Sequence, residues 1–497
     1  MSRKPAIRYR NDPAGCRLPI KLDSTSNGEY VPIPLDDINR QSNRVAQEHA
    51  TAHAKRSGMA RREFMVSLCG AASTLLAFNT VNAATQRSGG FYDLTAAASV
   101  DPDAAKAQLD GREFIFDVQG HFVNPEGKWL ERLPPTAKPL TFAPKTACAL
   151  ANKPGERSYL QCLGAKEFIK DVFLDSDTDM MVLSFVPSTY DSEPLTIEEA
   201  AQTRAIVEEM DGSHRLLLHG RCNPNQAGDM ERMEELAHEW KIAAWKCYTQ
   251  YGPDGSGFFL NDEIGIAFVE NARRLKVKNI AVHKGIPFGR KSYAHSTCAD
   301  IGPIAKRFPD MNFLIYHSGW VPGAKEGPYD PSRPDGIDAL ITSVLKSEVV
   351  AQGNVYAELG STWRGLMRDP GQAAHGIGKL LKHLGEDNVV WGTDSIWYGS
   401  PQDQILAFRA FQISEEFQER YGYPQITPQI RSKIFGLNAA RPYNISLDEA
   451  NKRTVDDRIT RQRHAYRHMP DPHFLTLGPK TRREFLNLLR WNGGRYA

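Results

Sequence analysis

Eight short β-rich runs that alternate with helical segments predict an α/β fold, a (β/α)8 barrel within residues 113–445. Repeated strand–helix–strand units favour a parallel sheet with right-handed crossovers. Two observations favour a closed TIM barrel over an open sheet: the unit recurs eight times, and no GxGxxG sequence follows the first run. The composition is 41% hydrophobic and 24% charged, which is average for globular proteins and argues against a disordered, fibrous or polytopic membrane protein.

The predicted strands are runs of seven to ten residues that are rich in β-branched and aromatic types. Helical stretches such as 262–276 and 376–384 lie between them. The connection 122–179 after the first strand is long and rich in proline, so we expect an elaborated loop over the barrel mouth. The eight predicted strands are residues 114–121, 180–188, 215–224, 243–250, 279–285, 312–319, 355–362 and 389–397.

The two ends of the chain lie outside the predicted barrel. Residues 1–60 are polar and lack sustained apolar periodicity, so we expect a flexible leader with no chemistry. Residues 446–497 contain many arginines and are predicted to form a helical C-terminal extension. The alternatives for this extension are a partner surface and a packed segment.

Residues 61–84 resemble a twin-arginine export signal. Arg61 and Arg62 precede an uncharged, largely apolar run and then small residues, and the run is too short for a comfortable membrane span. The pattern predicts export to the periplasm through the export machinery. The alternative is a cytoplasmic protein in which residues 62–78 form a buried or surface-docked helix.

The charge balance limits the classes of partner. Lys and Arg total 61 against 59 for Asp and Glu, so the long basic face of a nucleic-acid-binding protein is not expected. The expected partner is a small-molecule substrate. The sequence makes no prediction of the oligomeric state.

Side chains that can bind metal follow the ends of four predicted strands. Gln119 and His121 end the first strand, and they share one face because side chains alternate along an extended chain. His283, His317 and Asp394 end the fifth, sixth and eighth strands. Active sites of such barrels lie at the carboxyl ends of the strands, and imidazole and carboxylate are usual ligands of Zn²⁺ and similar ions. The pattern therefore predicts a metal centre at the barrel mouth.

Four ordered segments resemble the amidohydrolase superfamily, in the subgroup around aminocarboxymuconate-semialdehyde decarboxylase and related hydrolases. The first contains His283, the second runs from a helix end to His317, the third is a glycine, small residue, aspartate turn at Asp394, and the fourth resembles the segment that closes these barrels. The resemblance extends from about residue 114 to residue 445. The four segments are residues 280–285, 307–319, 392–395 and 433–441.

The resemblance implies a role for each strand-end residue. His121 and His283 would bind a divalent ion, Asp394 would be a ligand or a proton acceptor, and His317 would bind metal or move a proton. Zn²⁺ is the expected ion, with Mn²⁺ or another divalent ion as the alternative. Gln119 departs from the family pattern, which has histidine there, and its amide oxygen is a weaker donor to Zn²⁺ than imidazole. We expect Gln119 to be a direct ligand or to hydrogen-bond to one.

Other residues near the strand ends carry weaker signals. Lys246 resembles the bridging lysine of two-metal relatives, but a structural role in a one-metal site is favoured. Glu358 is expected to brace a histidine or to line the barrel. Six side chains are candidates for contacts with an anionic or aromatic substrate, with a surface position as the alternative for each: Tyr190, Arg221, Arg290, Trp320, Arg364 and Trp397.

Three functions remain open at this point. The leading one is hydrolysis of a small amide, lactone or ester by metal-activated water, with Asp394 or His317 as proton acceptor. The second is non-oxidative decarboxylation of an aromatic or unsaturated carboxylic acid. The third is a non-catalytic barrel that binds a small molecule and has lost productive metal binding through Gln119.

Overall fold

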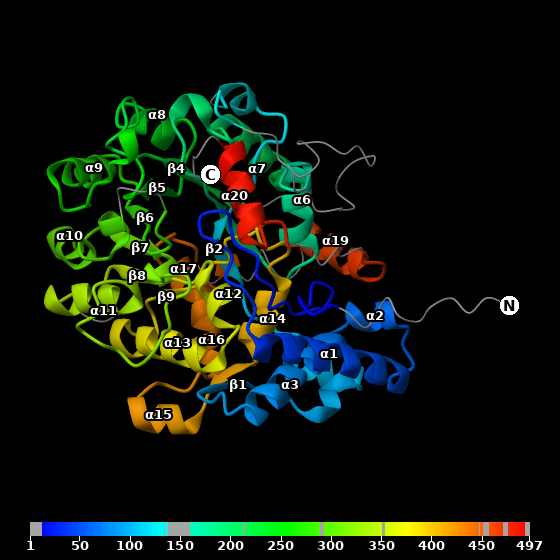
Figure 1. The fold of residues 1–497 in the computed structure, drawn as a ribbon. Helices are drawn as coiled ribbons and strands as arrows, with labels where there is room; N and C mark the ends of the chain where they lie inside the picture. Colours follow the sequence, from blue (N-terminus) through cyan, green and yellow to red (C-terminus); the bar gives the residue numbers. More distant parts are fainter. Residues whose placement is uncertain are drawn as a thin grey trace.

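The predicted parallel barrel is present in the structure, a computed structural model (Figure 1). The structure describes residues 12–133, 135–137, 160–211, 214–288, 293–349, 353–446, 448–450, 457–470 and 476–492. Eight parallel strands pair in the order in which they occur along the chain, as repeated βαβ units require. The barrel strands are β2 (Phe116–Gly120), β3 (Met180–Leu183), β4 (Leu216–Arg221), β5 (Ala244–Tyr248), β6 (Asn279–His283), β7 (Asn312–Tyr316), β8 (Val355–Glu358) and β9 (Val389–Val390).

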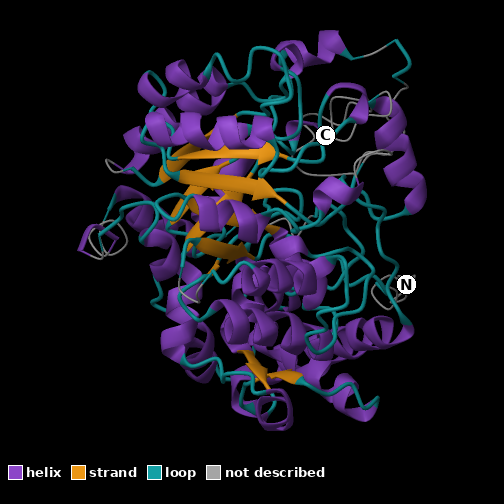
Figure 2. Cartoon of the chain, turned by 90° about the vertical axis from the view of Figure 1, so that its left-hand side faces the viewer, coloured by secondary structure: helices purple, strands orange, loops and turns teal. Residues whose placement is uncertain are grey.

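Helices surround the strands on the outside of the barrel (Figures 1 and 2). A small antiparallel sheet of β1 (Gly90–Tyr92) and β10 (Phe411–Ile413) lies apart from the barrel. One helix of the surrounding layer follows each of the strands β3 to β9: α7 (Ile197–Asp211), α8 (Met233–His238), α9 (Glu263–Arg274), α10 (Ile301–Arg307), α11 (Gly336–Lys346), α13 (Pro370–Leu384) and α14 (Gln402–Ala410). Further helical segments are η2 (Lys128–Arg132), α6 (Ala165–Ile169), η4 (Lys170–Leu174), η5 (Tyr190–Ser192), η6 (Pro253–Gly255), η7 (Tyr293–Ser296), η8 (His317–Gly319), α12 (Thr362–Leu366), α15 (Glu415–Tyr421), α16 (Pro428–Ser432), η9 (Lys433–Leu437) and α17 (Asn438–Ala440).

The barrel closes between its first and last strands. The amide of Val118 donates to the carbonyl of Trp391 at 3.0 Å, and the amide of Asp394 donates to the carbonyl of Gln119 at 3.0 Å. Segment η9 supports this seam, because the amide of Trp391 donates to the carbonyl of Ile434 at 3.0 Å. The seam therefore places Gln119 and Asp394, which are 275 residues apart in the sequence, side by side.

Apolar side chains fill the barrel interior below the mouth. Because side chains alternate along a strand, one set points inward and the other packs against the surrounding helices. The polar residues of the site lie at the carboxyl ends of the strands. The inward set includes Phe116, Val118, Met180, Val182, Ala244, Ala281, Leu314, Tyr316 and Val390.

Residues 12–60 differ from the flexible leader that we expected. Helix α1 (Asp37–Arg56) begins at Asp36, whose carboxylate accepts from the amide of Asn39, and it packs against α3 (Leu68–Ala84). Its buried stripe consists of Ala46, Ala50 and Ala54, spaced one helical turn apart. Alanine gives a weak apolar signal in a polar segment, which is why the sequence pattern did not reveal this helix. Residues 1–11 lie outside the described residues.

The apolar run behind the twin arginines forms a buried helix in the structure. After α2 (Arg61–Met65), helix α3 buries Cys69, Leu75 and Phe78, and η1 (Ala96–Ser99) and α4 (Pro102–Leu109) pack against it. Among the described residues, no helix has the length and hydropathy needed to cross a membrane. Export through a twin-arginine signal stays a prediction.

The C-terminal extension is helical, as predicted. Helices α19 (Arg458–Arg467) and α20 (Arg482–Trp491) pack on the barrel side that carries the loop after β2. The chain before α20 crosses the barrel mouth, where the amide of Leu477 donates to the carbonyl of Trp397 at 2.8 Å. The extension therefore contributes to the surroundings of the site.

Candidate active site

The first strand brings two of the predicted residues to Asp394. The pairing of β2 with β3 shifts register between Asp117 and Gly120, next to the turn that carries Asp394. The Gln119 Nε2 atom donates to Asp394 Oδ1 at 3.1 Å, and His121 Nε2 lies 3.3 Å from the same oxygen. Gln119, His121 and Asp394 thus form one buried group, as their positions at the strand ends predicted.

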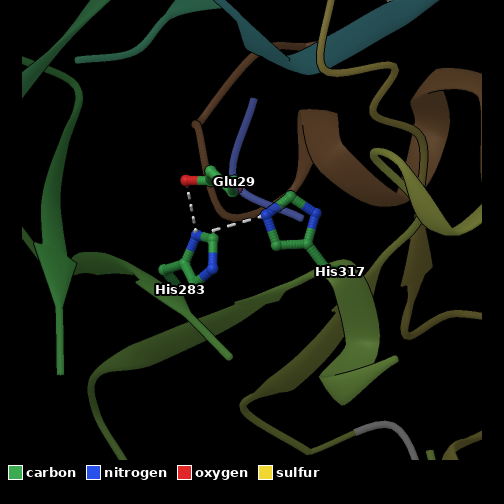
Figure 3. A group of neighbouring side chains, drawn as sticks. All are labelled: Glu29, His283 and His317. Atoms are coloured by element: carbon green, nitrogen blue, oxygen red, sulfur yellow. Dashed lines mark hydrogen bonds and ion pairs between the residues drawn. The ribbon is translucent and has the colours of Figure 1, made fainter. Parts of the chain in front are cut away.

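Strands β6 and β7 form a second group at the same mouth. His283 Nδ1 and His317 Nε2 are 3.3 Å apart, and Glu29 Oε1 lies 3.8 Å from His283 Nδ1 (Figure 3). One ligand atom from each of these three buried residues lies within 4.8 Å of the other two. The sequence analysis identified the two histidines but not Glu29.

The outer nitrogens of both histidines face backbone carbonyls. His317 Nδ1 lies 2.7 Å from the carbonyl of Gly360, and His283 Nε2 lies 3.5 Å from that of Ile286. A carbonyl can only accept, so the 2.7 Å contact places the proton of His317 on Nδ1, and the longer contact favours the proton of His283 on Nε2; in this arrangement the inner nitrogens keep their lone pairs. Two lone pairs 3.3 Å apart repel each other, and a cation between them would relieve that repulsion.

Asn27 connects the two groups. Its Nδ2 atom donates to Glu29 Oε2 at 2.6 Å and to Asp394 Oδ2 at 3.0 Å. Its Oδ1 atom accepts from the amide of Glu29 at 3.0 Å, so the turn is held locally. Both residues lie in the segment where no chemistry was expected. The pattern Asn27-Gly28-Glu29 marks a turn, and nothing local in it indicates that the turn docks at the barrel mouth.

The loops after β7, β8 and β9 adopt left-handed backbone conformations. His317, Ser361 and Asp394 have φ values of 64°, 55° and 59°. Such residues persist only where their surroundings hold them in place. Here Glu358 accepts from the amides of His317 (2.9 Å) and Gly360 (2.5 Å), and Ser361 Oγ donates to Asp394 Oδ2 at 2.5 Å. Glu358 therefore braces the His317 loop through its backbone rather than through the imidazole ring.

Burial sets the protonation states in the site. It lowers the pKa of His317 to about 3, and lowers the pKa values of His121 and His283 well below their ordinary value, so all three imidazoles are neutral at pH 7. Burial also raises the pKa of Asp394, and burial together with the nearby Asp394 charge raises the pKa of Glu29 to about 8. The site is buried and holds two carboxyl groups whose charged forms would be stabilised by a cation.

Lys246 and the aromatic residues complete the surroundings. Lys246 is fully buried, its Nζ lies 3.8 Å from the centre of the Tyr316 ring, and burial lowers its pKa to about 8. Trp397 stacks on His121 with ring centres 5.8 Å apart. Tyr248 lies beside His283 at 5.1 Å. Both imidazoles therefore face aromatic rings.

The remaining candidates for substrate contacts are two arginines in buried ion pairs, two aromatic residues, and one arginine outside the described residues. Arg221 and Arg364 are buried in ion pairs, with Glu193 and Asp229 for Arg221 and with Asp23 and Asp403 for Arg364. Their charges are neutralised within the protein, so they are unsuited to a substrate carboxylate. Trp320 packs edge-on against Tyr30 at 6.1 Å, and Tyr190 is 56% exposed. Arg290 lies outside the described residues.

Gln119 is placed with its amide nitrogen, not its oxygen, toward His121 and Asp394. Its buried Oε1 atom has no hydrogen-bond partner and lies beside Gly360, where an added Cβ would come within 2.2 Å of it. The hydrogen-bond network decides the orientation of the amide. With both neighbours able to accept, the network favours Gln119 as a donor that positions Asp394. Its role as a direct ligand stays a prediction.

Substitutions at Gln119 separate the two roles. If the oxygen turns to bind the ion, Gln119→His should preserve or tighten Zn²⁺ binding, and Gln119→Ala should weaken it by about 10-fold or more. If the amide only positions Asp394, Gln119→Ala should keep its metal and turn over more slowly. Metal content by elemental analysis, measured beside turnover, distinguishes these results.

The arrangement defines a class: α/β barrels with a buried histidine–carboxylate centre at the carboxyl ends of the strands. The model of the amidohydrolase family matches residues 116–445, about two thirds of the 497 residues. The chain therefore belongs to the amidohydrolase family. This confirms the resemblance seen in the sequence. A search of curated protein sequences found no match.

Several solved structures are similar at low identity. The 5-carboxyvanillate decarboxylase from Sphingomonas paucimobilis is 12% identical with a TM-score of 0.41, over 67% of this chain and 99% of that one. The 5-carboxyvanillate decarboxylase from Novosphingobium aromaticivorans, which carries bound manganese, is 13% identical with a TM-score of 0.42 (67% and 97%). Dihydroorotase from Saccharomyces cerevisiae is 11% identical with a TM-score of 0.38 (68% and 86%). The family model, not these structures, carries the assignment.

Proposed function

We propose that this protein is a divalent-metal-dependent hydrolase of a small amide, lactone or ester. The observation that supports it most is the convergence of the inward lone pairs of His283 and His317 on one buried point beside carboxylate oxygens. Neutral histidines whose outer nitrogens are held by backbone carbonyls are typical of metal ligands. The residues present therefore fit a divalent ion.

His121, His283 and Asp394 would hold the ion, with His317 as a further ligand or proton carrier. When bound, the ion would polarise a carbonyl and lower the pKa of water towards neutrality. Zn²⁺ suits the imidazole nitrogens, while the carboxylate oxygens also suit Mn²⁺. We propose Zn²⁺, with Mn²⁺ as the alternative.

Asp394 is the proposed proton acceptor. Its Oδ2 atom accepts from Asn27 and Ser361, and its Oδ1 atom accepts from Gln119. These donors fix the carboxylate in one orientation, which removes the need to order it during the reaction. Burial raises its affinity for a proton, which brings its pKa closer to that of a general base at neutral pH.

Decarboxylation of an aromatic or unsaturated carboxylic acid is the second candidate, and one observation favours it. The imidazoles of His121 and His283 are flanked by Trp397, Tyr248 and Phe288, with ring centres 5.1 to 5.8 Å from the imidazoles. Aromatic walls suit a flat substrate, and a site that excludes water favours loss of a carboxylate charge.

A combined metal and product assay tests the proposed function. Purified protein should contain about one equivalent of divalent metal, and a substrate panel should show ester, lactone or amide hydrolysis that a chelator abolishes. Release of carbon dioxide from aromatic acids, without hydrolysis, would favour the second candidate. If the protein binds no divalent metal and turns over no substrate, the remaining possibility is a non-catalytic barrel that has lost metal binding through Gln119.

A further inference from the structure

We propose that Glu29 is a metal ligand, and that the N-terminal segment 23–30 is a built-in part of the metal centre. The inference rests on the proposed metal-dependent function and adds to it a ligand from outside the family segment 116–445. Glu29 would bind the ion together with His283 and His317. The chemistry of this set is two imidazole nitrogens and one carboxylate oxygen, which suits Zn²⁺ or Mn²⁺.

The spacing of the three donor atoms supports this assignment. Two ligand atoms that each lie about 2.1 Å from a tetrahedral ion are about 3.4 Å apart. The distance from His283 Nδ1 to His317 Nε2 is 3.3 Å, and that from His283 Nδ1 to Glu29 Oε1 is 3.8 Å (Figure 3). Small side-chain movements would bring all three atoms onto one ion.

The contacts of the two Glu29 carboxylate oxygens also support a role as a metal ligand. Oε2 accepts from Asn27, while Oε1 faces His283. With its proton on Nε2, His283 directs a lone pair at Oε1, so the charged form of Glu29 is repelled unless a proton or a cation lies between the two atoms. The carboxylate is held against this repulsion, and a cation shared by both atoms would turn it into attraction.

A second carboxylate would help to balance the charge of a divalent ion. Buried charges are paired or coordinate metals, and the three histidines of the site contribute no charge when neutral. At the ion, Asp394 would supply one negative charge, and Glu29, whose side chain is 8% exposed, would supply a second. Glu358 and Lys246 are buried in the same site and contribute charges of opposite sign.

Several buried contacts hold the segment 23–30 at the barrel mouth, so it is a fixed part of the site and not a segment that leaves when substrate binds. Asp23 pairs with Arg364 and accepts from Thr476, and the amide of Ser26 donates to the carbonyl of Pro479 at 2.9 Å. Tyr30 bonds Tyr398 through their hydroxyls at 3.2 Å. The N-terminal segment and the C-terminal extension therefore contact each other at the barrel mouth. These contacts hold Glu29 in place whether or not an ion is bound.

Glu29 also compensates for the departure at position 119. The amide of Gln119 is a neutral and weak donor, and its nitrogen faces the site. An anionic oxygen from the N-terminal segment restores donor strength that the strand-end histidine would otherwise supply. The chain therefore builds its centre from the barrel together with a segment that the family pattern lacks.

The test uses full-length protein stripped with a chelator and titrated with Co²⁺, whose visible absorption reports its ligands. Glu29→Gln keeps the shape of the side chain and should weaken Co²⁺ and Zn²⁺ binding by about 10-fold or more and change the spectrum. Glu29→Asp should restore part of the affinity. The matched control is Glu48→Gln on the exposed face of α1, which should bind as the wild type does.

Each outcome bears on the inference. An unchanged affinity and spectrum in Glu29→Gln would overturn it, and tighter binding would show instead that Glu29 plugs the site. If Glu29→Gln does not fold, Glu29→Ala takes its place, and an unchanged affinity and spectrum in Glu29→Ala overturns the inference equally. His283→Ala separates the two proposals: metal lost in His283→Ala but kept in Glu29→Gln removes only the role of Glu29. If the wild-type protein binds neither Co²⁺ nor Zn²⁺, both the metal-dependent function and the role of Glu29 are wrong.

Discussion

His283→Ala is expected to lose bound divalent metal and turnover together, by more than about 100-fold in metal affinity. The side chain directs its Nδ1 lone pair to the point where His317 and Glu29 also face, and it is 1% exposed, so water cannot replace it easily. Loss of a group that only orients a ligand costs about 10- to 100-fold, and loss of the ligand itself should exceed that. Elemental analysis and chelator competition measure the change.

The control for this variant is His214→Ala. His214 lies at the surface with 70% of its side chain exposed, and its Nδ1 atom lies 2.7 Å from Glu208 Oε1. It should keep metal and activity within error. Full metal occupancy in His283→Ala would contradict the proposed centre.

Asp394→Asn is expected to lower turnover by about 10²- to 10⁴-fold even when the assay contains saturating metal, because an amide cannot accept the proton. The substitution keeps the size of the side chain and one oxygen for the ion. It also sets an NH₂ group against donors from Asn27, Ser361 and Gln119, so some loss of thermal stability should accompany it.

Metal content and kcat must be measured on the same preparation of Asp394→Asn. A metal-loaded variant with wild-type kcat would exclude Asp394 as the proton acceptor and leave His317 for that role. A variant whose only defect is weak metal binding, cured by added metal, would make Asp394 a ligand without a role in proton transfer.

Much of the barrel was predictable because its signals are local. Strand and helix patterns alternate along the chain, and every predicted strand corresponds to one of β2 to β9. The predicted strand 389–397 shows the limit: only Val389–Val390 pairs as a strand, and the chain then turns at Asp394 with a left-handed φ. The residue pattern predicts that a strand is present here. The direction in which the chain leaves that strand depends on the contacts of Asp394 with Gln119 and Ser361.

The sequence by itself determined the fold class and the strand-end positions of Gln119, His121, His283, His317 and Asp394, because residue type and strand periodicity are local properties. Only the tertiary structure decided that Asn27 and Glu29 join them, since they are about 250 residues or more from their partners in the chain. A turn of polar residues has the same local signal whether it lies in solvent or in a barrel mouth. Its place is decided by distant contacts, those of Asp23 with Arg364 and of Ser26 with Pro479, which no periodicity in the segment encodes.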